Sequence, residues 1–205
     1  MKPIATDFYL QDTVTVARQL IGTYLVRRID RVTSVGRIVE TEAYREDEPA
    51  SHSFRGQTER TAPMFRSGGI AYVYLIYGMH CCFNVVTEPA GVGCAVLVRA
   101  IEPTEGVEAM WTRRFPQLPF SESEVHTIAN GPGKLCRAMD IDRNDNGVSL
   151  GDGDIILMSS ADPPRVEIKV SRRIGITKAQ DRPWRFTEKG SLAVSGARRK
   201  RSSSV

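Results

Sequence analysis

Apolar and polar residues follow two periods along the first half of the chain, one typical of a helix and one typical of strands. Apolar residues recur at helical spacing from Asp12 or Thr13, which can cap a helix, to about Ile21, and Gly22 follows as a stop. Runs rich in β-branched and aromatic residues predict strands at residues 24–29, 35–44, 71–77, 81–87 and 93–102. The first half therefore predicts one helix and several strands.

The second half mixes short helical and strand-like segments. Pro103 is expected to start a helix that runs to Arg113 or Arg114, and a second helical stretch begins near Ser121. Residues 131–134 can open a further helix over residues 135–139. The remaining segments predict short strands at residues 154–158, 165–170, 174–176 and 191–194.

This order of elements predicts the fold class. Strands and helices do not alternate regularly, so we expect an α+β fold: a single mixed domain with a curved, mostly antiparallel sheet, flanking helices and a protruding β-hairpin. The hairpin is predicted at residues 71–87, with its turn at Gly78-Met79-His80. Residues 45–69 form a long polar stretch, and a loop of that length in a compact domain is usually functional or disordered.

Composition narrows the class of protein. The 205 residues are 41% hydrophobic and 25% charged, which is typical of a globular domain. The longest apolar run, residues 70–77, is too short to cross a bilayer, so no membrane partner is expected. The four cysteines form no C-x-x-C and the three histidines no H-E-x-x-H, so neither a disulfide framework nor a metal site is indicated. A reducing compartment is expected, which means the cytoplasm (the nucleoid of a bacterium) or a eukaryotic nucleus.

Charge is distributed unevenly along the chain. The formal net charge is +4, and four basic residues stand together at 198–201; without them, basic and acidic residues balance at 24 each. Residues 1–195 are thus expected to form a neutral domain, and residues 196–205 a basic, disordered tail. Within the domain, residues 165–189 hold eight basic and three acidic residues, whereas residues 40–48 hold five acids and one arginine.

One predicted strand face carries two carboxylates. Side chains alternate in a strand, so Glu40, Glu42 and Tyr44 share a face that could form a hydrolytic site. The alternative is a solvated sheet face whose acids pair with Arg37 or another base. Arg99 lies in an apolar strand and needs a carboxylate if it is buried, with Glu42 or Glu40 as its natural partner.

The predicted hairpin is rich in tyrosine. Tyr72 and Tyr74 point one way and Tyr77 the other, at the start of the turn. They could form a stacking platform with an intercalating wedge, or they could simply pack the core. Asn84, on the second hairpin strand, needs polar partners if it is buried, and it could instead bind the edge of a ligand.

Together, these segments resemble the 3-methyladenine (alkyladenine) DNA glycosylase family. The matching stretches follow in family order and cover about residues 5–195: GRIVETEAY at 36–44, SHS at 51–53, YVYLIYGMHCCFN at 72–84, VLVRAIEP at 96–103, NGPGKL at 130–135, RIGI at 173–176 and PWRF at 183–186. This resemblance implies a DNA repair enzyme that flips alkylated, and in some cases deaminated, purines out of duplex DNA. It implies hydrolysis of the N-glycosidic bond in base excision repair, without metal or organic cofactor.

The resemblance also implies the catalytic residues. Glu42 would be the general base that activates water, and Arg99 would help place that water with the main chain near Ile174. Glu40 lies on the same predicted face, and the residues alone do not decide which carboxylate meets the water. A catalytic lysine is not implied, so a Schiff-base mechanism is not expected.

Further residues are implied for the base and the DNA. Tyr44, His52 and Tyr74 would stack on the flipped base, and Asn84 would line the pocket floor and disfavour the guanine amino group. At the hairpin tip, Tyr77 would enter the base stack with Met79 and His80 beside it. The basic residues that we expect at the DNA backbone are Lys134, Arg172, Arg173 and Lys178.

The expected protein is a monomer that acts on double-stranded DNA. Two other classes stay open from the residues alone. One is a nucleic-acid-binding module without enzymatic activity that uses its tyrosines for stacking. The other is a glycoside hydrolase in which Glu40 and Glu42 act as paired acids.

Overall fold

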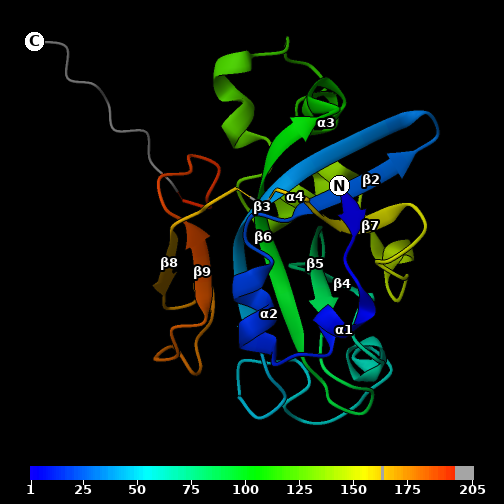
Figure 1. The fold of residues 1–205 in the computed structure, drawn as a ribbon, viewed down its shortest axis with the longest axis vertical. Coiled ribbons are helices and arrows are strands. Elements are labelled where there is room, and N and C mark those ends of the chain that lie inside the picture. Colours follow the sequence, from blue (N-terminus) through cyan, green and yellow to red (C-terminus); the bar gives the residue numbers. More distant parts are fainter. Residues whose placement is uncertain (163, 197–205) are drawn as a thin grey trace, which may run out of the picture.

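A computed structural model describes residues 1–162 and 164–196, and it shows a curled antiparallel sheet with helices packed around it (Figure 1). The predicted basic tail beyond residue 196 lies outside the described residues. Over the described ranges the strands are β1 (Lys2–Pro3), β2 (Tyr24–Ile29), β3 (Val32–Tyr44), β4 (Ala71–Ile76), β5 (His80–Val86), β6 (Ala95–Glu105), β7 (Ile155–Ser159), β8 (Ile168–Ser171) and β9 (Arg185–Glu188). The α-helices are α1 (Thr6–Tyr9), α2 (Thr13–Gln19), α3 (Val107–Arg114) and α4 (Pro132–Met139), and short 3-10 helices are Ala62–Phe65, Glu122–Thr127 and Arg143–Asp145.

Strand β3 organises the sheet. The strand order is β1-β7-β2-β3-β6-β5-β4, and β9 pairs with both β3 and β8. The first half of β3 pairs with β2, its second half with β9, and nearly its whole length with β6. The pairing with β6 shifts register at Val35–Gly36 and around Glu40. Because these irregularities bend and twist a strand, β3 carries much of the curvature that wraps the sheet around the core.

The helices cover the sheet and close the core. Helix α2 begins at the predicted cap, where the Asp12 carboxylate accepts a hydrogen bond from the Thr15 N–H at 3.0 Å. Its apolar side packs on β3 and β6, and Thr41 donates a hydrogen bond to the carbonyl of Ala17 at 2.6 Å. Helices α3 and α4 pack on each other, and α4 lies against β5 and β6. Helix α4 thus packs against the strand that carries Arg99.

Strands β4 and β5 form the predicted hairpin. Ile76 pairs with His80, so the tip is Tyr77-Gly78-Met79. Tyr77 and Gly78 have positive φ angles of 53° and 70°. This is the backbone of a tight hairpin turn whose twist matches the strands, and Gly78 adopts it without cost. The tyrosine at the tip is thus held in a conformation that non-glycine residues rarely take.

The fold class is confirmed, with several corrections to the elements. Pro103 does not start a helix, because β6 continues through it to Glu105 and α3 begins after Gly106. Pro103 sits opposite the irregularity at Gly36, where a missing N–H is tolerated. Residues 174–176 and 191–194 form no strands, and β9, which was not predicted, pairs with β3 instead. Among the described residues, no helix is long and apolar enough to cross a membrane.

The long stretch at residues 45–69 is packed onto the domain. Glu48, Ser51 and Ser53 are buried, and a 3-10 helix buries Met64. The Ser51 and Ser53 hydroxyls bond to each other at 2.7 Å, and Ser53 also bonds to the carbonyl of Gly93. The segment is therefore an ordered loop that carries His52 to the face of the hairpin.

Candidate active site

Glu42 is buried near the end of β3 and is held by three donors. Its side chain is inaccessible to solvent. One oxygen, Oε2, accepts from the Tyr44 hydroxyl at 2.8 Å and from Nη1 of Arg99 at 3.1 Å. The other, Oε1, accepts from the main-chain N–H of Ile174 at 2.9 Å. The structure therefore brings together the four residues for which the sequence suggested a shared site.

Glu40 has a different environment from Glu42. Its carboxylate is also fully buried, and it accepts from Nε of Arg99 at 2.9 Å and from Nε of Arg185 at 2.7 Å. The alternative of a solvated acidic face is wrong, because neither carboxylate reaches solvent and Arg37 pairs with Glu102 and Glu188 instead. Arg99 bridges the two carboxylates, which compensates the cost of burying each charge.

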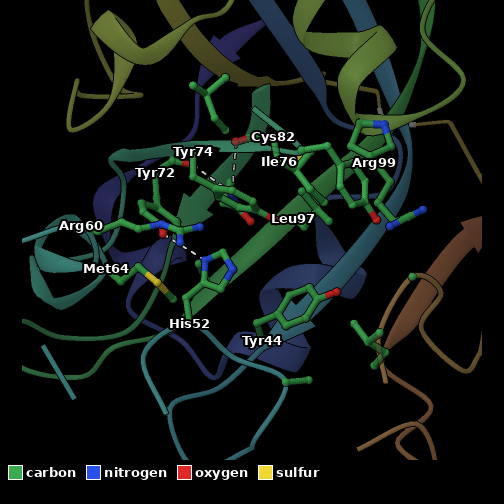
Figure 2. Close-up of a pocket in the computed structure, with 18 of the residues that line it drawn as sticks. Tyr44, His52, Arg60, Met64, Tyr72, Tyr74, Ile76, Cys82, Leu97 and Arg99 are labelled. Atoms are coloured by element: carbon green, nitrogen blue, oxygen red, sulfur yellow. Dashed lines mark hydrogen bonds between the residues drawn. The ribbon is translucent and has the colours of Figure 1, made fainter. Parts of the chain in front are cut away.

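A cavity of about 540 Å³ opens beside this ionic cluster. Tyr44, Arg99 and Ile174, which all bond to Glu42, line it. Glu42 itself lies directly behind them and is not among the lining residues. Figure 2 shows Tyr44 on one side of this space and His52, Tyr72 and Tyr74 on another. A flat ligand held between these rings would meet the wall that Glu42 supports.

The aromatic side chains hold one another in place. The His52 and Tyr74 rings meet edge to face with their centroids 4.5 Å apart, and Nδ1 of His52 lies 3.0 Å from the Tyr72 hydroxyl. Tyr72 lies at 5.5 Å from Tyr74. Burial raises the pKa of Tyr44 and Tyr74 well above the ordinary value, so both hydroxyls stay protonated. The Tyr44 hydroxyl can therefore donate to Glu42 at any physiological pH.

Asn84 is buried on β5 and lines the cavity. Its Nδ2 donates to the carbonyl of Tyr72 at 2.9 Å and more weakly to that of Cys82 at 3.4 Å. Both bonds hold the amide in one orientation against the hairpin backbone. The amide is thus a rigid polar group in an otherwise apolar strand, which satisfies the need for partners that its sequence context raised.

The hairpin tip extends past the cavity. Tyr77 is 85% exposed and Met79 is 73% exposed, and His80 beside them is exposed as well. Tyr77 also lines the mouth of the cavity. Large apolar side chains that stand free at a turn are unusual for a structural hairpin and indicate an interaction surface.

One of the predicted DNA contacts is contradicted by its surroundings. Arg173 is buried, forms a two-pronged ion pair with Glu48, and donates to the carbonyl of Ala43 at 2.8 Å. Its guanidinium carbon lies 4.7 Å from the centroid of the Tyr44 ring. A phosphate cannot reach a guanidinium that is enclosed in this way, so Arg173 supports Tyr44 instead. Arg172 and Lys178 are exposed and stay candidates for DNA contacts.

The basic stretch at residues 165–189 is also less available than its charge count suggested. Arg185 bonds to Glu40, Lys189 pairs with Glu167, and Arg182 stacks on Trp184 with its guanidinium carbon 4.5 Å from the ring centroid. Among the described residues, the basic members of this stretch without an ion pair are Arg165, Lys169, Arg172 and Lys178.

A second basic region, which the sequence count did not reveal, lies next to the hairpin. Arg114, Lys134 and Arg137 line a cleft of about 400 Å³ together with His80 and the start of α4. Burial and the neighbouring Arg114 charge lower the pKa of Lys134, and burial and Arg137 lower that of Arg114. Three cations converge here, and no ion pair joins them to an acid in the part of the chain that the structure describes. Lys134 does bond to Asn130 at 2.7 Å.

Arg60 is another pocket residue that sequence reasoning missed. It reaches the cavity from the loop at residues 45–69, with its guanidinium carbon 5.5 Å from the centroid of the Tyr74 ring (Figure 2). Burial and, next, the Arg60 charge lower the pKa of His52, which keeps the imidazole neutral at physiological pH. A charged residue in a long polar loop carries no sequence signal that distinguishes it from its neighbours.

The pKa of Glu42 is raised above its ordinary value of 4.5. Burial is the main cause, and the Glu40 charge adds to it. Arg99, the Ile174 N–H and the Tyr44 hydroxyl oppose the shift. A raised pKa makes the carboxylate a stronger base, while the three donors keep it in one orientation.

Over residues 1–162 and 164–196, no group of three or more His, Cys, Asp or Glu side chains is arranged to hold a metal ion.

Comparison with known proteins gives the class of this chain. The family described as methylpurine-DNA glycosylase matches residues 7–192. A protein of Methanoculleus marisnigri is 51% identical over 191 residues, covering 92% of this chain and 96% of its own. Proteins of Desulfitobacterium hafniense and Bacillus cytotoxicus are 42% and 45% identical, covering 95% and 87% of this chain and 99% and 92% of their own. All three have the words 3-methyladenine DNA glycosylase in their names.

These matches establish an enzyme of DNA repair. The chain belongs to the methylpurine-DNA glycosylase family. It is a DNA glycosylase, a hydrolase of N-glycosyl bonds that acts on damaged DNA in base excision repair. Neither a binding module without activity nor a hydrolase of oligosaccharides is favoured.

The role of Arg60 at the pocket can be tested by titration. We expect Arg60→Gln to raise the pKa of His52, because a positive charge no longer opposes protonation of the imidazole. The measurement is an NMR titration of the His52 ring protons. Arg55→Gln, an exposed neutral replacement in the same loop, is the control and should leave the midpoint unchanged. Equal midpoints in Arg60→Gln and the wild type would contradict the expected coupling.

Proposed function

We propose that this glycosylase flips a damaged purine out of duplex DNA into the aromatic cavity and releases it with a water activated by Glu42. One observation carries the assignment of the base. Glu42 is held by Tyr44, Arg99 and the Ile174 N–H, all of which line the cavity. Glu40 shares only the Arg99 contact with the cavity wall, because its other donors, Arg185 and Ser195, do not line the cavity. The geometry therefore favours Glu42 over Glu40.

The reaction needs few protein groups. The flipped purine stacks between Tyr44 and the pair of His52 and Tyr74, next to Asn84. Glu42 takes a proton from water as the water oxygen attacks C1′ of the sugar and the C1′–N bond breaks. Positive charge develops on the sugar in this step, and the carboxylate stabilises it. Alkylation has already activated the leaving base, so one oriented base can suffice.

The DNA is held by several separate parts of the surface. Tyr77 fills the space that the flipped nucleotide leaves, which offsets part of the unstacking cost. The cleft of Arg114, Lys134 and Arg137 lies beside the hairpin and suits backbone phosphates. Arg172 and Lys178 add contacts on the side of the cavity formed by residues 174–176. The enzyme would act as a monomer where the chromosome lies, in the cytoplasm of a prokaryote or in a nucleus.

Replacement of the proposed base is the direct test. We expect Glu42→Gln to lower the single-turnover rate of base release from duplex DNA containing a methylated adenine by about 10²–10⁴-fold, because the amide cannot accept the proton. DNA affinity should stay near the wild-type value, since Glu42 is buried behind the cavity wall. Glu59→Gln, on the exposed loop, is the matched control. Full activity of Glu42→Gln would refute the assigned role.

The raised pKa of Glu42 predicts a pH dependence. The base must be ionised, so base release should decline as pH falls through the pKa of Glu42. Because burial places that pKa above 4.5, the midpoint of the acid limb should also lie above 4.5. The measurement is the single-turnover rate at saturating enzyme across acidic and neutral pH. A rate that stays constant down to the ordinary glutamate range would contradict this prediction.

The hairpin tip should contribute to flipping and not to bond cleavage. We expect Tyr77→Ala to lower the single-turnover rate on a paired lesion by about 10- to 100-fold, because the unstacked state loses its wedge. The defect should shrink when the lesion lies in single-stranded DNA, where unstacking costs less. Base release from both substrates, measured side by side, gives the comparison. The same defect on both would assign Tyr77 to the chemical step instead.

A further inference from the structure

The carboxylate of Glu40 is fully occupied, and half of its hydrogen bonds come from the end of the described chain. Ser195 donates its main-chain N–H to Oε2 at 2.7 Å and its hydroxyl to Oε1 at 2.8 Å. Oε1 also accepts from Arg99 and Arg185. Ser195 lies beyond residues 7–192, where the family matches, so family membership does not assign this contact.

The segment that carries Ser195 is packed in place. Ala193 is 1% exposed and lies in a small apolar cluster with Val39 of β3 and Ala100 of β6. These two residues are the immediate neighbours of Glu40 and Arg99 in their strands. The same packing that buries Ala193 thus directs Ser195 onto Glu40. Glu40 is fully buried and Ser195 is partly exposed, so the contact lies at the boundary of the sheet interior.

Arg99 is shared between two carboxylates that compete for it. Its Nε lies 2.9 Å from Glu40 and its Nη1 lies 3.1 Å from Glu42. Attraction between charges falls with distance and is strong where water is excluded. If Glu40 had fewer donors of its own, Arg99 would move toward Glu40 and away from Glu42. The donors on Glu40 therefore determine how much of the Arg99 charge Glu42 receives.

We propose that Ser195 is a positioning residue that saturates Glu40 and so keeps Arg99 on the catalytic carboxylate. This inference rests on the proposed role of Glu42 as the base. Ser195 touches neither the cavity nor Glu42, and it acts through Glu40 and Arg99. The C-terminal segment at residues 193–195 thereby becomes part of the active-site support.

The proposal predicts shifts of opposite sign in the pH profile. The charged and titratable groups around Glu42 are Arg99 on β6, Glu40 and Tyr44 on β3, Arg185 on β9, and Arg173. Arg99 lowers the pKa of Glu42 and Glu40 raises it. Loss of the Ser195 hydroxyl draws Arg99 toward Glu40, which raises the pKa of Glu42. Neutralising Glu40 removes a repulsive charge and releases Arg99 to Glu42, which lowers that pKa.

The test uses full-length point variants. In Ser195→Ala, we expect the single-turnover rate of base release at neutral pH to fall about three- to tenfold, less than for the loss of a direct hydrogen bond to a charged group, because the effect passes through Glu40 and Arg99. The acid limb of the pH profile should move to higher pH, while the dissociation constant for lesion-containing duplex DNA stays within about twofold. Ser195→Thr keeps the hydroxyl and should restore the wild-type rate and the wild-type position of the acid limb.

Two further variants complete the test. Glu40→Gln should move the acid limb to lower pH, opposite to Ser195→Ala, which a general loss of stability would not produce. Ser191→Ala removes a hydroxyl that bonds to the Ala193 N–H in the same segment, and it should leave the limb in place. If the acid limb of Ser195→Ala stays at its wild-type pH, or if Ser191→Ala moves the acid limb by the same amount as Ser195→Ala, the proposed role of Ser195 is overturned. Full activity of Glu42→Gln would instead overturn the proposed function, so the two failures are distinguishable.

Discussion

The buried charge cluster on β3, β6 and β9 is the constraint on which the rest of the structure depends. Two carboxylates and two guanidinium groups lie in the sheet interior, and each would be strongly unfavourable without its partners. These ion pairs constrain the register of three strands, because Glu40 lies opposite Ala100, next to Arg99 on β6, and Glu42 lies opposite Arg185 on β9. The register shifts around Glu40 occur where this cluster has to be accommodated. The irregular sheet and the chemical site therefore have one cause.

This constraint explains which parts of the site could be predicted from the sequence. Arg99 lies in an apolar strand, and a buried guanidinium needs a carboxylate, so its pairing with Glu40 or Glu42 followed from residue types alone. For Arg173, by contrast, the residue type led to a wrong prediction of a DNA contact. Its partner Glu48 lies 125 residues away in the chain, and a count of basic residues cannot show which ones are neutralised by distant acids. Long-range pairing likewise makes β9 a strand, although its four residues carry little signal of their own.

The aromatic cavity combines attraction and repulsion toward a charged base. Electron-rich ring faces attract cationic purines. However, Arg173 lies over the Tyr44 ring and Arg60 over the Tyr74 ring. The Arg173 charge is balanced by Glu48, so it mainly orients its ring. Arg60 has no ion pair within the described ranges, and its charge opposes a cationic ligand as it opposes protonation of His52. In the proposed function, stacking area, which is independent of charge, therefore carries much of the binding to the base.

Whether a surface cation is available to DNA phosphates also depends on whether it already has a partner within the protein. A chain whose domain has as many acids as bases binds a polyanion only where cations are left unpaired and close together. Four of the eight cations in residues 165–189 are already engaged with acids or aromatic rings. Arg114, Lys134 and Arg137 converge from α3 and α4 with no ion pair to an acid among the described residues, although Arg114 lies over the Phe115 ring. Gly133 brings α4 close to His80 at the hairpin. The proposed phosphate site therefore lies where two helices meet the hairpin, and the fold, more than the net charge, brings its cations together.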